Sequence, residues 1–248
     1  MRRLVLGSVL TLLALTAAQA QETAATLLDK AMQAAGGEAK LAKLQGLMLK
    51  GKGTFHEPGG QNIPFTAVWH YQGRDKYRQY MEMEVMKKKT MELRVVNGDK
   101  GWTKDGPLEA EIMDKDELNE EKENVYFNWV TTLAPLKGKD FKLTKADEIK
   151  VDGKAAIGLL IASKGHRDVK LYFDKETHAL VKTERKVRDL STRKDILEEM
   201  YFSNVKDVDG IKLPLKYAVK WDGQPLADAE MTEAKATEKL DEKLFAKP

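Results

Sequence analysis

The spacing of apolar and polar residues along the chain changes near residue 46. Before that point, apolar residues between Leu27 and Ala35 recur at three- and four-residue intervals, which predicts an amphipathic helix over 22–35. Gly36-Gly37 supplies a stop for this helix. After residue 46 apolar and polar residues alternate through most of the chain, a pattern typical of antiparallel strands with one buried face and one solvated face.

The alternation divides into two groups of predicted strands. In the first group it covers 47–55, 62–71, 77–85 and 90–95, and a short strand with Trp102 follows the hairpin signal Asn97-Gly98. In the second group the predicted strands cover 141–151, 155–163, 169–173, 179–188, 196–206, 211–221 and 226–236. We therefore predict a sheet of about a dozen strands.

One predicted helix lies between the two groups of strands. Residues 114–133 open with acidic residues, and Leu118, Val125, Trp129 and Leu133 fall on one stripe. Pro135 ends the segment. No linker rich in Pro, Gly or Ser separates the two groups, so we expect a single domain over residues 21–248.

A sheet of this size that is dry on one face must curl, close or split. Since only two predicted helices are long enough to cover the dry face, we expect a cavity between sheet and helices, with the apolar inner face as the candidate ligand site. The alternative is that the same residues only pack the helix over 114–133 onto the sheet. The residues expected to line the cavity are Leu49, Phe65, Trp69, Tyr77, Met81, Met83, Met91, Leu93, Trp129, Leu133, Leu215, Tyr217 and Trp221.

The first twenty residues have the three parts of a secretory signal peptide. Met1-Arg2-Arg3 is basic, Leu4 to Leu15 is apolar, and Ala18-Gln19-Ala20 resembles a cleavage site. A retained membrane anchor is the alternative, but it needs roughly 20 apolar residues. We therefore predict cleavage after Ala20 and export to a periplasm.

Export changes how the charge is interpreted. The 248 residues contain 42 Lys and Arg and 39 Asp and Glu; without Arg2 and Arg3, 40 basic residues face 39 acidic ones. The charges are mixed along the chain, which argues against a nucleic-acid partner. The cluster Lys87-Lys88-Lys89 is predicted to be a solvated hairpin turn rather than a contact to anionic lipid, so we expect only peripheral or transient membrane contact.

Candidate chemistry is sparse. The chain has no cysteine, which excludes disulfides, zinc fingers, iron–sulfur clusters and thiol catalysis. It has no nucleophile elbow, HExxH motif, P-loop or dinucleotide-binding glycine pattern, and its four histidines lack a second histidine at metal spacing. Glu82 and Glu84 lie on the predicted solvated face, where they are interpreted as surface charge. We predict no catalytic residue, no metal and no cofactor.

Several short segments, in order along the chain, form a recognisable series. The helix before Gly36-Gly37 and the first strand come first. The later segments are Asp75-Lys76-Tyr77-Arg78, Val96-Asn97-Gly98-Asp99-Lys100-Gly101-Trp102, Tyr172-Phe173-Asp174-Lys175-Glu176-Thr177, Val208-Asp209-Gly210-Ile211-Lys212-Leu213-Pro214 and Leu244-Phe245-Ala246-Lys247-Pro248. In this order the chain resembles the periplasmic lipoprotein-carrier family, the LolA/LolB-like proteins and the outer-membrane lipoprotein-sorting proteins.

The resemblance implies an α+β fold, mainly β: a curved, incomplete antiparallel β-barrel of about 11–12 strands with helices as a lid over an apolar cavity. It also implies that the cavity takes up a lipid or the acyl chains of lipoproteins. Where these carriers have an arginine that holds the lid closed, this chain has Gly73, and Arg74 follows one position later as the lid-closing candidate.

Two functions fit the resemblance. The first is a periplasmic carrier or binding protein for a lipid, a lipidated protein or another amphiphile. The second is an envelope interaction or stress-sensing module that binds a protein partner and carries no cargo, because a fold does not fix a function. Without a lipobox cysteine the chain is not expected to be a membrane-anchored acceptor, and a monomer is expected.

Overall fold

The computed structural model describes residues 22–57 and 59–248, so the predicted signal peptide lies outside the described residues. The helices are α1 (Ala24–Ala34), α2 (Glu38–Leu41) and α3 (Lys115–Thr131), with 3-10 turns η1 (Ala134–Lys137) and η2 (Glu242–Phe245). The strands are β1 (Gly46–His56), β2 (Asn62–Gln72), β3 (Lys76–Val85), β4 (Lys88–Asn97), β5 (Lys100–Asp105), β6 (Glu111–Ile112), β7 (Phe141–Val151), β8 (Lys154–Ser163), β9 (Val169–Asp174), β10 (Leu180–Asp189), β11 (Lys194–Val208), β12 (Ile211–Trp221) and β13 (Gln224–Thr237).

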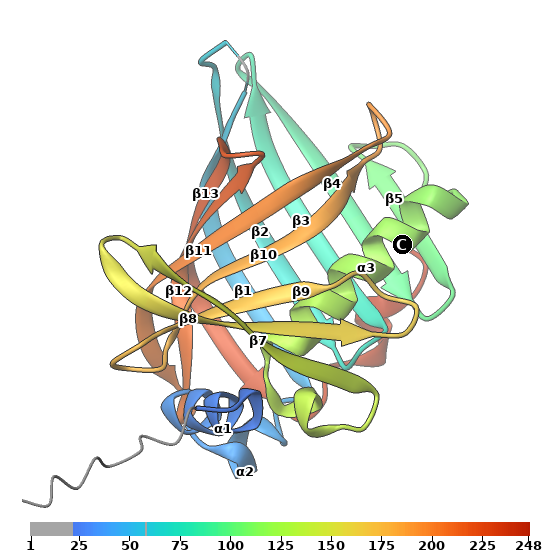
Figure 1. Cartoon of the computed structure of the whole chain (residues 1–248). Helices are drawn as coiled ribbons and strands as arrows, with labels where there is room; N and C mark the ends of the chain where they lie inside the picture. Colours follow the sequence, from blue (N-terminus) through green and yellow to red (C-terminus); the bar gives the residue numbers. More distant parts are fainter. Residues whose placement is uncertain (1–21, 58) are drawn as a thin grey trace, which may run out of the picture.

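All thirteen strands belong to one antiparallel sheet, in the order β6-β5-β4-β3-β2-β1-β13-β12-β11-β10-β9-β8-β7. The chain builds the first half outward from β1 to the edge at β6. It then crosses through α3 and η1 to the opposite edge at β7 and returns to β13, which pairs with β1. The sheet curves around α3, which connects its two edges (Figure 1).

The predicted incomplete antiparallel barrel with helices is confirmed. The structure has more strands than the expected 11–12. β6 went unpredicted because two residues, Glu111 and Ile112, are too short to establish a period. The 3-10 turns η1 and η2 were not predicted either, since a single turn of helix has no amphipathic repeat.

Helix α1 closes one end of the curved sheet through apolar contacts (Figure 1). The Thr23 hydroxyl caps it by accepting a hydrogen bond from the backbone N–H of Thr26 at 3.1 Å. Its buried residues Leu27 and Leu28 join a core cluster with the inner faces of β8 and β9. Gly36 ends the segment at φ 123°, and a Cβ there would lie 2.4 Å from the carbonyl oxygen of Gly210. The predicted stop is therefore also a close backbone approach.

Helix α3 is held differently along its length. The Asp114 carboxylate caps it by accepting a hydrogen bond from the backbone N–H of Glu117 at 2.8 Å. In its C-terminal half Val125, Phe127 and Val130 are buried against the sheet and α1. Its N-terminal half contacts strands and loops mainly through glutamates, and Leu118 adds an apolar contact to the cluster of Tyr77 and Val96.

The sheet is not dry on one face only, which corrects our expectation. Phe245 in η2 is completely buried on the outer face, in a cluster with Leu93 and Val95 of β4. The amide of Asn97 donates a hydrogen bond to the carbonyl oxygen of Phe245 at 3.2 Å. The C-terminal segment therefore covers an apolar patch that would otherwise face water.

Candidate functional site

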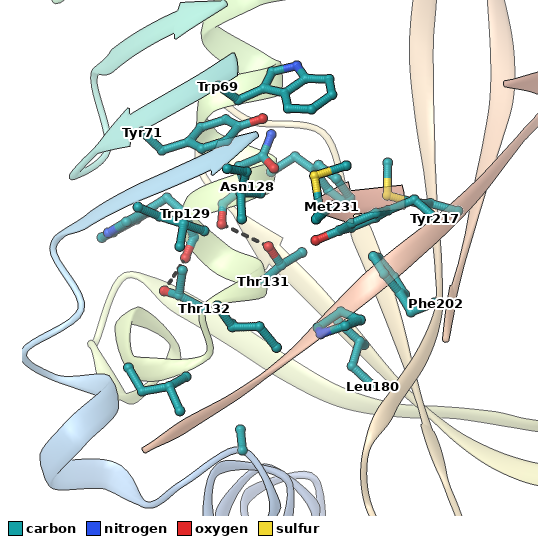
Figure 2. Close-up of a pocket in the computed structure, with 18 of the residues that line it drawn as sticks. Trp69, Tyr71, Asn128, Trp129, Thr131, Thr132, Leu180, Phe202, Tyr217 and Met231 are labelled. Atoms are coloured by element: carbon teal, nitrogen blue, oxygen red, sulfur yellow. Dashed lines mark hydrogen bonds between the residues drawn. The ribbon is translucent and has the colours of Figure 1, made fainter. Parts of the chain in front are cut away.

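A cavity of about 810 Å³ lies between the inner face of the sheet and helices α1 and α3. Strands β1, β2, β3, β10, β11, β12 and β13 form its wall, and Phe127, Asn128 and Trp129 of α3 face it from the other side. Figure 2 shows side chains from the sheet and from α3 projecting into the same space. Its volume falls in the usual range for small-molecule sites, about 300–1,000 Å³.

Most of the residues predicted to line the cavity do lie on its wall. Phe65 and Met81 pack together on neighbouring strands, and Phe65 contacts Trp69 edge to face with ring centroids 6.4 Å apart. Trp129 covers the cavity from α3, beside the ring of Phe141 at 5.8 Å. The predicted residues found on the wall are Leu49, Phe65, Trp69, Tyr77, Met81, Trp129, Leu133 and Tyr217.

Two predicted lining residues, Met91 and Leu93, lie on the opposite face of the sheet. The register of β3 and β4 places Leu93 opposite Tyr80, and both side chains pack in the outer cluster with Phe245. Directly opposite residues of an antiparallel pair point to the same side, so Leu93 cannot share the face of Tyr77. The inward residue near this end of β4 is Val96, opposite Tyr77.

The other three exceptions lie near the cavity without lining it. Leu215 is buried behind the wall, in a cluster with Leu49 and Met231. Met83 lines a second hollow of about 980 Å³, which shares Phe65 and Tyr217 with the cavity and is otherwise rich in charged residues. The indole N–H of Trp221 donates a hydrogen bond to the Glu198 carboxylate at 3.2 Å.

Arg74 is exposed in the turn between β2 and β3, and within the described residues it forms no ion pair or side-chain hydrogen bond. The arginine that reaches α3 across the cavity is Arg185 of β10. Its guanidinium donates to the side-chain oxygen of Asn124 at 3.1 Å and lies 4.0 Å from the ring centroid of Phe127. In this structure Arg74 does not contact α3, and Arg185 is the arginine that joins β10 to α3; a lid-closing role for Arg74 stays a prediction.

Arg185 is itself compensated by a buried carboxylate. Its Nε donates to Glu198 at 2.6 Å, and both side chains are about one-tenth exposed. A second arginine, Arg94 of β4, binds Glu92 and also Glu121 of α3, the latter at 2.8 Å. These pairs are on the inner side of the sheet, where water does not screen them fully.

The inward face of β1 carries Gly51 and Gly53, which lie opposite Ala67 and Phe65 of β2, and our sequence analysis left this signal unused. A Cβ at Gly53 would lie 2.3 Å from the ring of Phe65, and one at Gly51 would lie 2.8 Å from Met231. Glycine in a strand interior marks a close approach of another group. These positions let Phe65 and Met231 lie flat against β1.

Polar residues on the cavity wall were also missed, chiefly Tyr71, Gln79, Asn128 and Arg185. Tyr71 continues the alternation of Phe65 and Trp69 along β2, so its inward direction was available from the period. Gln79 and Arg185 lie on the inward faces of their strands, but residues of these types are usually solvated. No local pattern distinguishes them from surface residues.

Within residues 22–57 and 59–248, no group of three or more His, Cys, Asp or Glu side chains is arranged to hold a metal ion. Over the same residues, no helix combines the length and apolar character required to cross a bilayer.

Known proteins resemble this chain in fold. No family model matches the sequence, and no curated protein matches it. Among solved structures, a LolA superfamily protein from Nitrosomonas europaea matches 91% of this chain and 98% of its own, at 10% identity and a TM-score of 0.57. A protein domain from Vibrio parahaemolyticus described as an outer membrane lipoprotein-sorting protein matches 90% and 97%, at 12% identity and a TM-score of 0.58. A DUF1329 family protein from Desulfovibrio piger matches 90% and 97%, at 12% identity and 0.57. The chain therefore has a LolA-like fold.

Proposed function

We propose that this protein is exported to the periplasm and binds or carries the acyl chains of a lipid or lipoprotein in the cavity under α3. The observation that carries the proposal is the cavity of about 810 Å³, walled by aromatic side chains and Met81 and covered by a helix that charged contacts hold. The LolA-like fold supports the same role. The basic start, apolar run and Ala18-Gln19-Ala20 support export.

Burial of hydrocarbon supplies the affinity in this proposal. Each CH₂ group moved from water into the cavity contributes about 0.8 kcal/mol, so a chain of about a dozen carbons gains on the order of 10 kcal/mol before the cost of association. Methionine adapts to ligands of different shape because its side chain is unbranched and polarisable, and Met81 and Met231 both line the wall. No bond-breaking chemistry is part of the proposal.

The test uses the mature chain, residues 21–248, purified from a periplasmic extract and again after delipidation. Native mass spectrometry of the first preparation is expected to show co-purified lipid. The delipidated protein is expected to bind a fluorescent fatty acid saturably. Ala229→Trp should abolish that binding, because Ala229 lies on the cavity wall beside Phe65.

Ala162→Trp is the matched control. Ala162 is a half-buried alanine of β8 that lines neither hollow, so probe binding is expected to remain at the wild-type level. A folded protein that carries no lipid and binds no probe would overturn the proposal. Stoichiometric capture of a protein partner by such lipid-free protein would support the interaction module instead.

A further inference from the structure

The cavity wall contains hydrogen-bond donors that the protein itself does not use. Most tyrosine hydroxyls in the structure have an internal acceptor: Tyr77 donates to Gln79 at 2.6 Å, and Tyr80, Tyr172 and Tyr201 donate to glutamates. The hydroxyl of Tyr126 is buried without a hydrogen-bond partner, but Tyr126 does not line the cavity. Tyr71 and Tyr217 line the cavity, and neither hydroxyl has a hydrogen-bond partner in the described part of the chain.

These two hydroxyls approach the cavity from different strands. Figure 2 shows the hydroxyl ends of Tyr71 on β2 and Tyr217 on β12 directed into the space in front of α3. Neighbouring rings fix both orientations, since the ring of Tyr71 lies 5.2 Å from that of Tyr77 and the ring of Tyr217 lies 5.4 Å from that of Phe202. The donors are therefore held in place before any ligand enters.

Gln79 adds a third donor. Its side-chain oxygen accepts two hydrogen bonds, from the indole N–H of Trp69 at 3.2 Å and from the hydroxyl of Tyr77 at 2.6 Å. The indole N–H can only donate, so Trp69 fixes which end of the amide is the oxygen. The amide nitrogen then carries two N–H groups with no acceptor among the described residues, at a position on the cavity wall.

The charges around these donors disfavour an anion. Arg185 is paired with Glu198, and behind the wall Arg94 faces the three carboxylates of Glu92, Glu117 and Glu121. Lys206, Asp207 and Lys212 also line the cavity, so five carboxylates stand against four basic side chains in total. Burial, together with the phenol of Tyr217 and the carboxylate of Glu121, raises the pKa of Tyr71. Burial also raises the pKa of Tyr217. Both phenols remain neutral donors, and a ligand carboxylate would be repelled by the surplus carboxylates.

We infer that Tyr71, Tyr217 and Gln79 form a subsite for an uncharged acceptor oxygen of the ligand, the carbonyl of an ester- or amide-linked acyl chain. The surplus of negative charge around the subsite disfavours an ionised free fatty acid relative to such a ligand. The inference rests on the proposed function, since it assigns the polar end of a ligand whose hydrocarbon occupies the same cavity. Unpaired donors on an apolar wall select the ligand that satisfies them, because an alkane would leave them buried without acceptors.

The experiment compares three probes of equal chain length by displacement of a fluorescent acyl probe from the delipidated protein at pH 7.5. The probes are a dodecanoyl monoglyceride, sodium dodecanoate and dodecane. The wild-type protein is expected to bind the monoglyceride at least tenfold more tightly than the dodecanoate. In the Tyr71→Phe/Tyr217→Phe variant the affinity for the monoglyceride is expected to fall about tenfold. The affinity of the same variant for dodecane is expected to rise, because dodecane no longer buries two donors without acceptors.

Tyr201→Phe is the matched control, because its hydroxyl donates to Glu199 and it does not line the cavity. Its affinity for all three probes is expected to match that of wild type. Equal wild-type affinity for monoglyceride and dodecanoate, or a double variant that keeps wild-type affinity for the monoglyceride, would overturn the subsite and leave the proposed function standing. Failure of every probe to bind would overturn both.

Discussion

Helices α1 and α3 both cover the inner face of the sheet, but they are held by different forces. The inward side of α1 consists of Leu27, Leu28, Ala31 and Met32, and none of these is more than 2% exposed. The N-terminal half of α3 is bound through carboxylates, with Glu120 to Arg167 at 2.7 Å and Glu121 to Arg94 at 2.8 Å. Apolar burial fixes the first helix, whereas ion pairs and the single apolar contact of Leu118 hold the half of α3 that lies nearest Arg94.

This difference bears on which cover can open. Separating α1 from the sheet exposes apolar surface to water, at about 25 cal/mol per Å². Separating the N-terminal half of α3 exchanges ion pairs for hydrated charges, which costs little when the pairs are partly exposed. The residues of α3 that line the cavity, among them Asn124 and Asn128, lie in its C-terminal half, directly after this more weakly held half. We therefore expect α1 to act as a fixed plug, and the N-terminal half of α3 to act as a releasable cover that separates from the sheet first.

The largest expected effect comes from weakening the plug. Leu27→Ala should lower the free energy of unfolding by about 3–4 kcal/mol, because it removes a fully buried side chain and leaves a cavity. Urea denaturation followed by circular dichroism measures this loss. The matched substitution Leu108→Ala, at a leucine that is 62% exposed, should change stability by less than about 0.5 kcal/mol. Similar losses for the two variants would show that α1 is not fixed by apolar burial.

The next effect concerns the arginine that joins the sheet to α3. Arg185→Met should lower the free energy of unfolding by about 3 kcal/mol, because Glu198 would remain buried without its partner. The double variant Arg185→Met/Glu198→Met should recover most of that loss. Arg188→Met removes an exposed pair with Asp195 and should cost less than about 1 kcal/mol. No recovery in the double variant would mean that the contacts of Arg185 to Asn124 and Phe127 carry the effect.

The two helices also differ in how far the sequence predicted them. Both were located from apolar spacing: the predicted 22–35 contains α1, and the predicted 114–133 contains α3. The burial of Leu27 and Leu28 followed from the same spacing. The ion pairs of α3 could not be predicted, because Arg94 and Arg167 come from distant strands and loops that only the sheet topology brings to the helix.

The errors in the predicted site have the same origin. Alternation shows which residues of a strand share a face, but it does not show which face is inward. Both faces of β4 carry apolar residues, so the sequence alone does not show whether Leu93 or Val96 faces the cavity side of the sheet. The register with β3 shows that it is Val96. Phe245, which packs on Leu93 on the outer face of the sheet, comes more than 140 residues after β4 in the chain. Only long-range packing could assign Leu93 to it.

A smaller effect is expected from salt. Raising the NaCl concentration from 0.05 M to 1 M screens charges over distances of a few ångströms, so the ion pairs of Glu117, Glu120 and Glu121 should weaken. At about 0.5 kcal/mol for each pair, amide hydrogen exchange in the N-terminal half of α3 should accelerate about tenfold. Exchange in α1 should not accelerate, because its contacts are apolar. Equal acceleration in both helices would contradict the distinction between plug and releasable cover.

The smallest expected effect on stability comes from one carboxylate in the N-terminal half of α3, that of Glu117. Burial raises the pKa of Glu117; Arg94 opposes the shift, and Asp114, Glu121 and Glu92 add to it. A raised pKa means that the folded state binds the proton more tightly than the unfolded state, so this contribution to stability is complete below the unfolded pKa and is lost as the pH rises through the folded pKa.

At pH 7 the charge on Glu117 should therefore cost stability. Glu117→Gln should raise the free energy of unfolding by less than about 1 kcal/mol at pH 7, and should reduce the gain that wild type shows between pH 7 and pH 5. Asp116→Asn, in the same turn but two-thirds exposed, is the control for the charge of the helix end. If Glu117→Gln instead lowers stability at pH 7, the attraction between Glu117 and Arg94 outweighs both the burial of the carboxylate and the repulsion from its acidic neighbours. The N-terminal half of α3 would then be bound to the sheet more tightly than we expect.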